Sequence, residues 1–280
     1  YPAPPEALLT KCRLPGRSAN SRRLIVLGDS HAVRLFPLLG DLHEQLGWEV
    51  IGYGAEGQPF PALPYVLRNG RGRRQWQQVQ DRADQVLSQA LSQLRRGDVL
   101  LLKSFLDLYL IDDAFFVGGR RDRELKNEAW TTIDAETARA SWLRRLTRLA
   151  DQVGGVGARL VVVAPHPVFP GSLQTVPAEL CLPMWFRPVL APGCPAAYSV
   201  ERRRAINRVA PLLHDLREAA RRNPSMLGFE PFDWLCAPSA ERCTSVRDGR
   251  ILYTDNNHLS QDGSRLLLQP LMAVLRSHGE

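Results

Sequence analysis

Hydrophobic residues follow two alternating patterns along this 280-residue chain. Short continuous apolar runs have the length and composition of strands that are covered on both faces. Such runs occur at residues 24–27, 48–53, 98–103, 158–164 and, more weakly, 226–232. Between and after them, apolar residues recur every three or four positions, as on one face of a helix. These helical segments are residues 32–46, 75–96, 134–153, 199–222 and 260–276.

Strands that alternate with helices at this spacing predict the fold class. We expect an α/β protein, a three-layer α/β/α sandwich of the flavodoxin-like kind, with a parallel sheet of about five strands and right-handed crossovers. Residues 1–22 are rich in proline and polar residues and predict an extended arm or linker, and residues 23–280 predict one folded domain. Pro37 either distorts the first helix or starts it afresh, and Ser260 is a candidate N-cap of the last helix.

Several polar residues directly follow the predicted strands. In parallel sheets, ligands bind beyond the carboxyl ends of the strands. This rule selects Ser30 after the first strand, the glycine-rich loop at 54–58 after the second, Lys103 and Ser104 at the third, and His166 after the fourth. We expect these residues to form the functional site together with the segment before the last helix.

Ser30 lies between the first strand and the first helix, in the sequence GDSH at residues 28–31. The first N–H groups of a helix have no intrahelical acceptor, so they suit the oxyanion that forms when a serine attacks an acyl group. A serine needs a base, and residues 255–258, DNNH, offer the best candidate. There His258 can take the serine proton while Asp255 holds the imidazole. Taken alone, the first motif is more typical of a helix N-cap and the second of a helix-entry segment.

Together, the two motifs resemble those of the SGNH, or GDSL-type, hydrolase family. The resemblance rests on GDSH at residues 28–31 and on YTDNNHLSQDG at residues 253–263. This combination is most similar to the extracytoplasmic SGNH domains fused to membrane acyltransferases that O-acylate surface polysaccharides. The proline-rich arm is similar to the linker that joins those two domains.

The resemblance implies a Ser30 nucleophile and a His258 base with Asp255 as its partner. It also implies an oxyanion hole formed by the serine N–H, by a glycine N–H of the second block and by an asparagine side chain of the third block. Gly57 is the better match for this glycine, and Gly54 is the competing assignment.

The third block departs from the family pattern. After the strand at 98–103 the chain continues Ser-Phe-Leu-Asp, and no asparagine occupies the expected place. The oxyanion hole therefore either has two backbone donors or takes a third from Lys103 or Ser104. Loss of one such donor in other enzymes costs about 10²–10³ in rate, so we expect slow turnover of simple esters.

Other candidate residues carry weaker signals. His166 could line the site, although a loop histidine fixed between two prolines is the more frequent case. His31 could orient the loop, contact substrate or face solvent. Trp185 is the best candidate for stacking on a sugar ring. The sequence has neither a phosphate-binding glycine loop nor a metal-ligand spacing, so we predict no cofactor and no metal.

Charge and cysteine content bear on partners and location. The net charge is +7, but the arginines are scattered along predicted helices without a recognition motif, so we predict no nucleic-acid partner. A basic face toward anionic lipid or an acidic polysaccharide remains open. Pairing of Cys181 with Cys194 and of Cys236 with Cys243 would close two local loops, which fits an oxidising compartment, with Cys12 left over. Free thiols in a reducing compartment fit the spacing nearly as well.

These observations and the resemblance predict an O-acyltransferase domain, with acetyl as the expected group. We expect it to act on cell-surface or cell-wall polysaccharide through an acyl-serine intermediate. Its expected partners are a glycan acceptor, an acyl donor and a fused or associated membrane acyltransferase domain. The chain begins with Tyr1 and has no leader pattern, so we interpret it as a mature or excised fragment, tethered to the membrane in the full-length protein on the extracytoplasmic side. The alternatives are a stand-alone carbohydrate esterase or lipase of the same fold and a non-catalytic glycan-binding domain, which the missing asparagine favours.

Overall fold

The computed structural model describes residues 12–54, 57, 59–63, 65–67, 72–111, 123–170 and 199–276. Its centre is a six-stranded sheet with the order β1-β3-β2-β5-β7-β9. The strands are β1 (Arg13–Leu14), β2 (Arg23–Gly28), β3 (Glu49–Gly54), β5 (Val99–Lys103), β7 (Arg159–Val163) and β9 (Met226–Phe229). Every neighbouring pair from β3 to β9 is parallel, and β1 runs antiparallel to β3 at the edge. The predicted α/β fold with a mostly parallel sheet is therefore confirmed.

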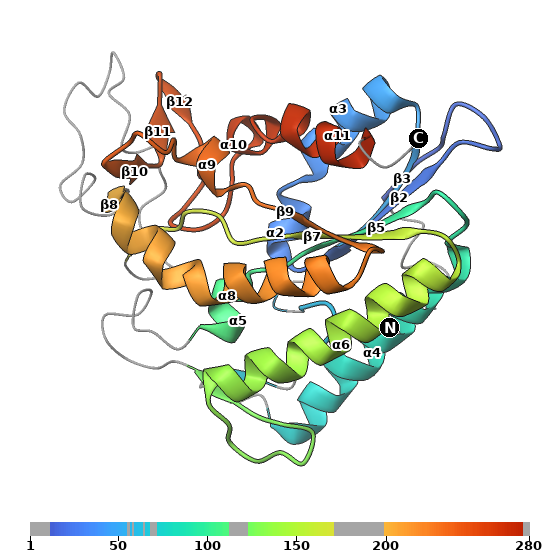
Figure 1. The fold of residues 1–280 in the computed structure, drawn as a ribbon, viewed down its shortest axis with the longest axis horizontal. Helices are drawn as coiled ribbons and strands as arrows, with labels where there is room; N and C mark the ends of the chain where they lie inside the picture. Colours follow the sequence, from blue (N-terminus) through green and yellow to red (C-terminus); the bar gives the residue numbers. More distant parts are fainter. Residues whose placement is uncertain are drawn as a thin grey trace.

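Helices cover both faces of this sheet (Figure 1). The long helices α4 (Arg73–Gln93), α6 (Ala135–Gly155) and α8 (Arg202–Arg222) lie on one side. On the other side are α3 (Phe36–Leu46), α10 (Gln261–Arg265) and α11 (Leu268–Arg276). The central strands need cover on both sides because they are apolar on both faces, and residues 24–27 have no exposed surface.

Short elements complete the described chain. Three two-stranded ribbons pair β4 (Tyr65–Leu67) with β6 (Arg123–Leu125), β8 (Ser199–Glu201) with β10 (Arg242–Thr244), and β11 (Val246–Arg247) with β12 (Arg250–Ile251). The short helices are α2 (Ser30–Val33), α5 (Leu106–Leu110) and α9 (Phe232–Leu235). Within the part of the chain described here, no helix is both long and apolar enough to cross a membrane.

The structure differs from the sequence expectations at three places and decides between two alternatives at a fourth. Residues 13–14 of the expected arm form the sixth strand, because β3 offers a free edge to which they can pair. Residues 199–201, expected to begin a helix, form β8 instead, since β10 pairs with them. Pro37 lies in the first turn of α3, a position that proline favours, so of the two alternatives the new helix start is the one observed. The last helix begins after Ser260 as expected, with the serine hydroxyl accepting from Gly263 N, but divides into α10 and α11.

The register of the sheet sets the geometry of its functional edge. Gly28, the last residue of β2, is level with Gly54 on one side and with Lys103 on the other. A Cβ atom added to Gly28 would lie 1.6 Å from the Lys103 carbonyl oxygen, so only glycine permits this approach of the two strand ends. The loops after β2, β3 and β5 therefore start side by side at one edge.

Candidate active site

Ser30 is the first residue of α2, directly after β2. The turn between strand and helix is held by Asp29, whose Oδ1 accepts a hydrogen bond from His31 N at 2.8 Å. This is an N-cap contact, so the motif does serve as a helix start. The same turn leaves Ser30 half-buried at the carboxyl edge of the sheet, where a ligand is expected.

Asp29 has a second role that the sequence did not indicate. Its Oδ2 accepts hydrogen bonds from Phe105 N at 2.7 Å and from the Tyr109 hydroxyl at 2.8 Å. The carboxyl is buried, which raises its pKa, while these hydrogen bonds and the one from His31 N oppose the increase. Asp29 thereby ties the loop after β2 to the loop after β5.

Ser30, His258 and Asp255 lie in a continuous chain of contacts. Ser30 Oγ is 2.8 Å from His258 Nε2, and His258 Nδ1 is 2.7 Å from Asp255 Oδ2. The serine and histidine are 228 residues apart in sequence. The side chains of His258 and Asp255 remain about one-fifth and one-quarter exposed, so the triad is open to a ligand. This is the geometry of a serine nucleophile with its base and the group that orients the base.

The spacing of Asp255 and His258 follows from a local turn. Asp255 Oδ1 accepts from the backbone N–H of both Asn257 and His258, at 2.9 and 2.7 Å. The other carboxylate oxygen is thus left for the imidazole. Burial by itself would raise the pKa of Asp255, but the hydrogen bonds from His258 and Asn257 outweigh it and lower the pKa below its usual value. The carboxylate therefore stays ionised at neutral pH and favours the Nδ1–H tautomer of His258.

The loop that carries Asp255 and His258, called the triad loop below, is anchored by two buried histidines, one in α2 and one in the segment after β7. His31 Nε2 is 3.0 Å from Asn257 Oδ1, and His166 Nε2 is 2.9 Å from the Asn257 carbonyl oxygen. Burial lowers the pKa of both rings well below the usual value, and neighbouring positive charges act in the same direction. Both rings are therefore neutral at pH 7, and each donates to Asn257. His31 is buried against Phe105, with ring centroids 4.3 Å apart, which excludes the solvent-facing alternative.

Two hydrogen bonds between Asn256 and Phe169 also anchor this loop. Asn256 is fully buried, its carbonyl oxygen accepts from Phe169 N at 2.8 Å, and its amide donates to the Phe169 carbonyl oxygen at 3.3 Å. Asn256 Oδ1 in turn accepts from Asn257 Nδ2 at 2.7 Å. The two asparagines between Asp255 and His258 therefore bind the triad loop to the segment after β7.

Lys103, the last residue of β5, is buried next to His166 and is 2% exposed. Its Nζ is 3.3 Å from the Ala164 carbonyl oxygen and 3.1 Å from His166 Nδ1. Burial lowers the pKa of Lys103 from 10.5 to about 8, although Asp107 and Asp29 favour the charged form. A lysine donor at Nδ1 leaves the proton of His166 on Nε2, where it faces the Asn257 carbonyl oxygen.

The remaining predicted oxyanion residues have different surroundings. Gly54 packs tightly, because a Cβ there would lie 2.4 Å from Val33 Cγ2. Gly57 has a φ of +66°, a conformation that favours glycine. Ser104 is buried and its Oγ accepts from Phe60 N at 3.4 Å.

The predicted disulfide between Cys236 and Cys243 is present, and Cys12 is an exposed free thiol. The other predicted pair, Cys181 with Cys194, and the candidate sugar platform Trp185 lie outside the described residues.

Comparison with known families agrees with the geometry. The family model of the SGNH domain that is fused to AT3 domains matches residues 2–273. The chain belongs to this family. The resemblance read from the GDSH and DNNH motifs is thereby confirmed. The sequence matches no curated protein.

Solved structures similar to this SGNH domain include the periplasmic domain of a lipopolysaccharide acetyltransferase from Salmonella ser. Paratyphi A. It is 13% identical with a TM-score of 0.54, over 92% of this chain and 85% of the other. A putative acylhydrolase from Bacteroides fragilis is 11% identical, with a TM-score of 0.48 over 95% and 92% of the two chains. An acetylxylan esterase from Geobacillus stearothermophilus is also 11% identical, with a TM-score of 0.46 over 94% and 97%. The first of these likenesses supports the assignment of the fold.

Proposed function

We propose that this SGNH domain transfers an acetyl group to a hydroxyl of a surface polysaccharide through an ester on Ser30. The observation that carries the proposal is the continuous contact from Ser30 Oγ through His258 to Asp255. The family supports the reaction class, since its members are fused to AT3 acyltransferase domains. The Salmonella domain, named as part of a lipopolysaccharide acetyltransferase, supports the acceptor class and an extracytoplasmic location. The Cys236–Cys243 disulfide is consistent with an oxidising compartment.

In the first half of the proposed reaction, Ser30 Oγ attacks the carbonyl carbon of the acyl donor while His258 Nε2 takes the hydroxyl proton. Asp255 stabilises the imidazolium that results. The tetrahedral intermediate collapses, the bond from the acyl carbon to the donor breaks, and His258 returns the proton to the leaving group. The acyl group is then held as an ester of Ser30.

In the second half, a sugar hydroxyl attacks the ester carbonyl and His258 takes its proton. The bond to Ser30 Oγ breaks, and the proton passes from His258 back to the serine. We assign the oxyanion to the backbone N–H groups of Ser30 and Gly57. Lys103 and Ser104 have contacts with Ala164, His166 and Phe60, so we give them positioning rather than donor roles.

The proposal is tested first by labelling with a fluorophosphonate and intact mass measurement. We expect one adduct on the wild-type domain and none on Ser30→Ala. His258→Ala and Asp255→Asn should label at least about 10³-fold more slowly, since base and orienting group act as one unit. Ser92→Ala, which removes an exposed serine of α4, is the control and should label normally. Absence of any adduct on the folded wild-type domain would support the glycan-binding alternative instead.

The second test separates transfer from hydrolysis. A chromogenic acetyl ester releases its phenol when Ser30 is acylated, and acetate appears only when water takes the acyl group. With a glycan acceptor present, transfer predicts that the ratio of acetate to phenol falls clearly below one and that acetylated glycan appears. A ratio that stays at one with every acceptor would identify an esterase.

A further inference from the structure

Two adjacent helices of the protein carry a net positive charge. α6 contains four arginines and two acidic residues, and α8 contains seven arginines and two acidic residues. Their net charges are +2 and +5. Four of these arginines pair with carboxylates of other elements: Arg145 with Glu128, Arg202 with Asp233, Arg208 with Asp107 and Arg217 with Glu230.

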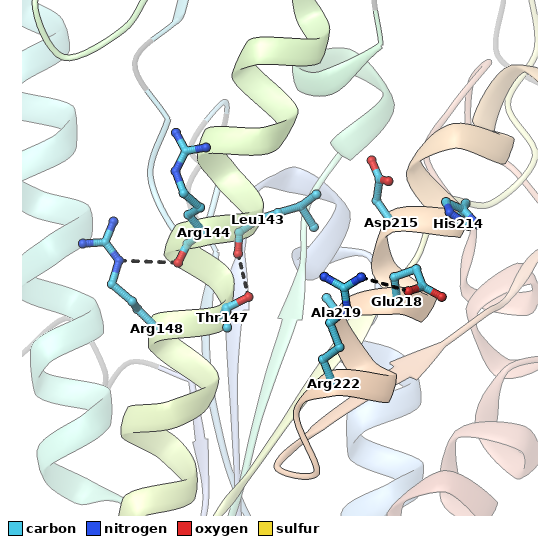
Figure 2. Close-up of a pocket in the computed structure, with 9 residues that line it drawn as sticks. All are labelled: Leu143, Arg144, Thr147, Arg148, His214, Asp215, Glu218, Ala219 and Arg222. Carbon is cyan, nitrogen blue, oxygen red and sulfur yellow. Dashed lines mark hydrogen bonds and ion pairs between the residues drawn. The ribbon is translucent and has the colours of Figure 1, made fainter.

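α6 and α8 lie next to each other on the same side of the sheet (Figure 1). Their outer surfaces enclose an open groove of about 660 Å³. Figure 2 shows Arg144 and Arg148 on the α6 wall, with Arg222 and His214 on the α8 wall. Leu143 and Ala219 also line the groove. Arginine and histidine side chains thus surround a partly apolar floor.

The acidic residues of the groove are already paired. Asp215 Oδ2 accepts from Arg139 Nε at 2.6 Å. Glu218 Oε2 contacts Arg221 at 2.5 Å and Arg222 at 3.4 Å, and these contacts lower its pKa. Within the described residues, the exposed side chains of Arg144 and Arg148 have no carboxylate partner. The groove therefore presents a surplus of cations at the surface.

The kinds of residues on this surface favour one class of anion. Proteins that bind sugars or single-stranded nucleic acids offer exposed aromatic rings for stacking. The only aromatic ring of α6 is that of Trp142, which has no exposed surface, and α8 has no Phe, Tyr or Trp. Phosphate groups need no stacking platform, and the arginine guanidinium matches their geometry. Each helix is about 30 Å long, so the pair presents an extended cationic surface rather than a point site.

We propose that the outer surface of α6 and α8 binds the phosphate headgroups of anionic phospholipids at a membrane surface. Each arginine near such a surface contributes about 1 kcal/mol, which is roughly fivefold in affinity. Several arginines together give measurable but salt-sensitive binding. The proposal is independent of the acyl-transfer reaction, because none of these residues belongs to the triad or its anchors.

The test is cosedimentation of the domain with vesicles. Wild-type protein should bind vesicles of phosphatidylcholine that contain phosphatidylglycerol, should not bind phosphatidylcholine alone, and should dissociate as salt rises. The triple variant R144E/R148E/R222E should bind more than about 100-fold more weakly. The control R73E/R74E/R82E makes the same change of charge at exposed arginines of α4, whose net charge is only +1, and should change binding less than about fivefold.

Two further variants keep the outcome interpretable. R144Q/R148Q/R222Q removes charge without adding repulsion and should weaken binding about 100-fold, which keeps the test available if the reversal variant fails to fold. Ser30→Ala should bind vesicles as the wild type does, so a failure of the catalytic proposal would not affect this result. The proposal is wrong if wild-type protein ignores the anionic vesicles or if the α4 control loses as much binding as the groove variant. It is also wrong if a soluble anionic polysaccharide binds as tightly as vesicles of equal charge.

Discussion

Lys103 provides a sharp test of how the site is held. Its ammonium group is buried beside His166 and the Ala164 carbonyl oxygen, and burial lowers its pKa from 10.5 to about 8. Below pH 8 both the folded and the unfolded chain carry the charge. The folded state then bears a cost of about 3 kcal/mol relative to an exposed lysine, because each tenfold change in proton affinity is worth about 1.36 kcal/mol.

The perturbation is Lys103→Met, which keeps the length of the side chain and removes its charge. At pH 7 the variant no longer bears the cost of burying the charge, so its folded state is stabilised by roughly 3 kcal/mol. It leaves the Ala164 carbonyl oxygen and His166 Nδ1 without their donor, at about 1–3 kcal/mol each. The two effects oppose each other, so we expect a change in the free energy of unfolding between a gain of about 1 kcal/mol and a loss of about 3 kcal/mol.

The pH dependence of stability distinguishes an effect of the buried Lys103 charge from an effect of side-chain packing alone. Between pH 8 and pH 10.5 the unfolded chain binds more protons at Lys103 than the folded chain does, so the stability of the wild type rises with pH. The variant lacks this increase. The stability of the wild type relative to the variant should therefore grow by about 2.5 kcal/mol from pH 7 to pH 10.

The assay is urea denaturation followed by circular dichroism at pH 7, 8, 9 and 10. Lys126→Met is the control for the loss of one lysine, since its ammonium donates to Thr132 Oγ1 at the surface. A stability difference between wild type and Lys103→Met that stays constant within about 0.5 kcal/mol over this pH range would refute the reasoning. It would mean that Lys103 is not buried in its charged form.

Three further substitutions have expected outcomes that thermal or urea denaturation can check. Arg208→Met removes an ion-pair partner of buried Asp107, which it contacts at 2.7 Å, and should cost about 3–5 kcal/mol, whereas a surface pair would cost less than 1. Gly28→Ala places a methyl group against the Lys103 backbone and should destabilise by more than about 3 kcal/mol or prevent folding; a change below 1 kcal/mol would contradict the close approach. Gly40→Ala, inside α3 with open space around the new methyl group, should instead stabilise by about 0.5–1 kcal/mol.

The contacts around β5 show what the residues there do in place of the asparagine of the family pattern. In this chain the strand ends in a lysine that turns inward to His166, and the following loop is held by Asp29 through Phe105 and Tyr109. The residues of this loop support the triad loop rather than point a side-chain amide at an oxyanion. Slow hydrolysis of simple esters remains our prediction, because two backbone donors are fewer than the three of the family pattern.

The sequence alone determined the features that depend on short-range periodicity. Continuous apolar runs and helical stripes specified the alternation of strands and helices, because burial on both faces or on one face leaves a pattern in neighbouring positions. The GDSH and DNNH motifs indicated the serine, the histidine and the aspartate, since Asp255 and His258 are connected by a local turn. The disulfide within residues 236–243 was also a local inference.

Only the tertiary structure decided the features that depend on distant partners. The sixth strand and β8 form because an edge or a second strand is available, which no local pattern records. The sequence did not predict the roles of Asp29, Asn256 and Asn257. A polar loop residue that faces solvent and one that binds a buried group have the same sequence pattern. Likewise, the arginines looked scattered in sequence. The fold brings Arg144, Arg148 and Arg222 to one groove by packing α6 beside α8, since the apolar stripes of both helices must cover the same face of the sheet.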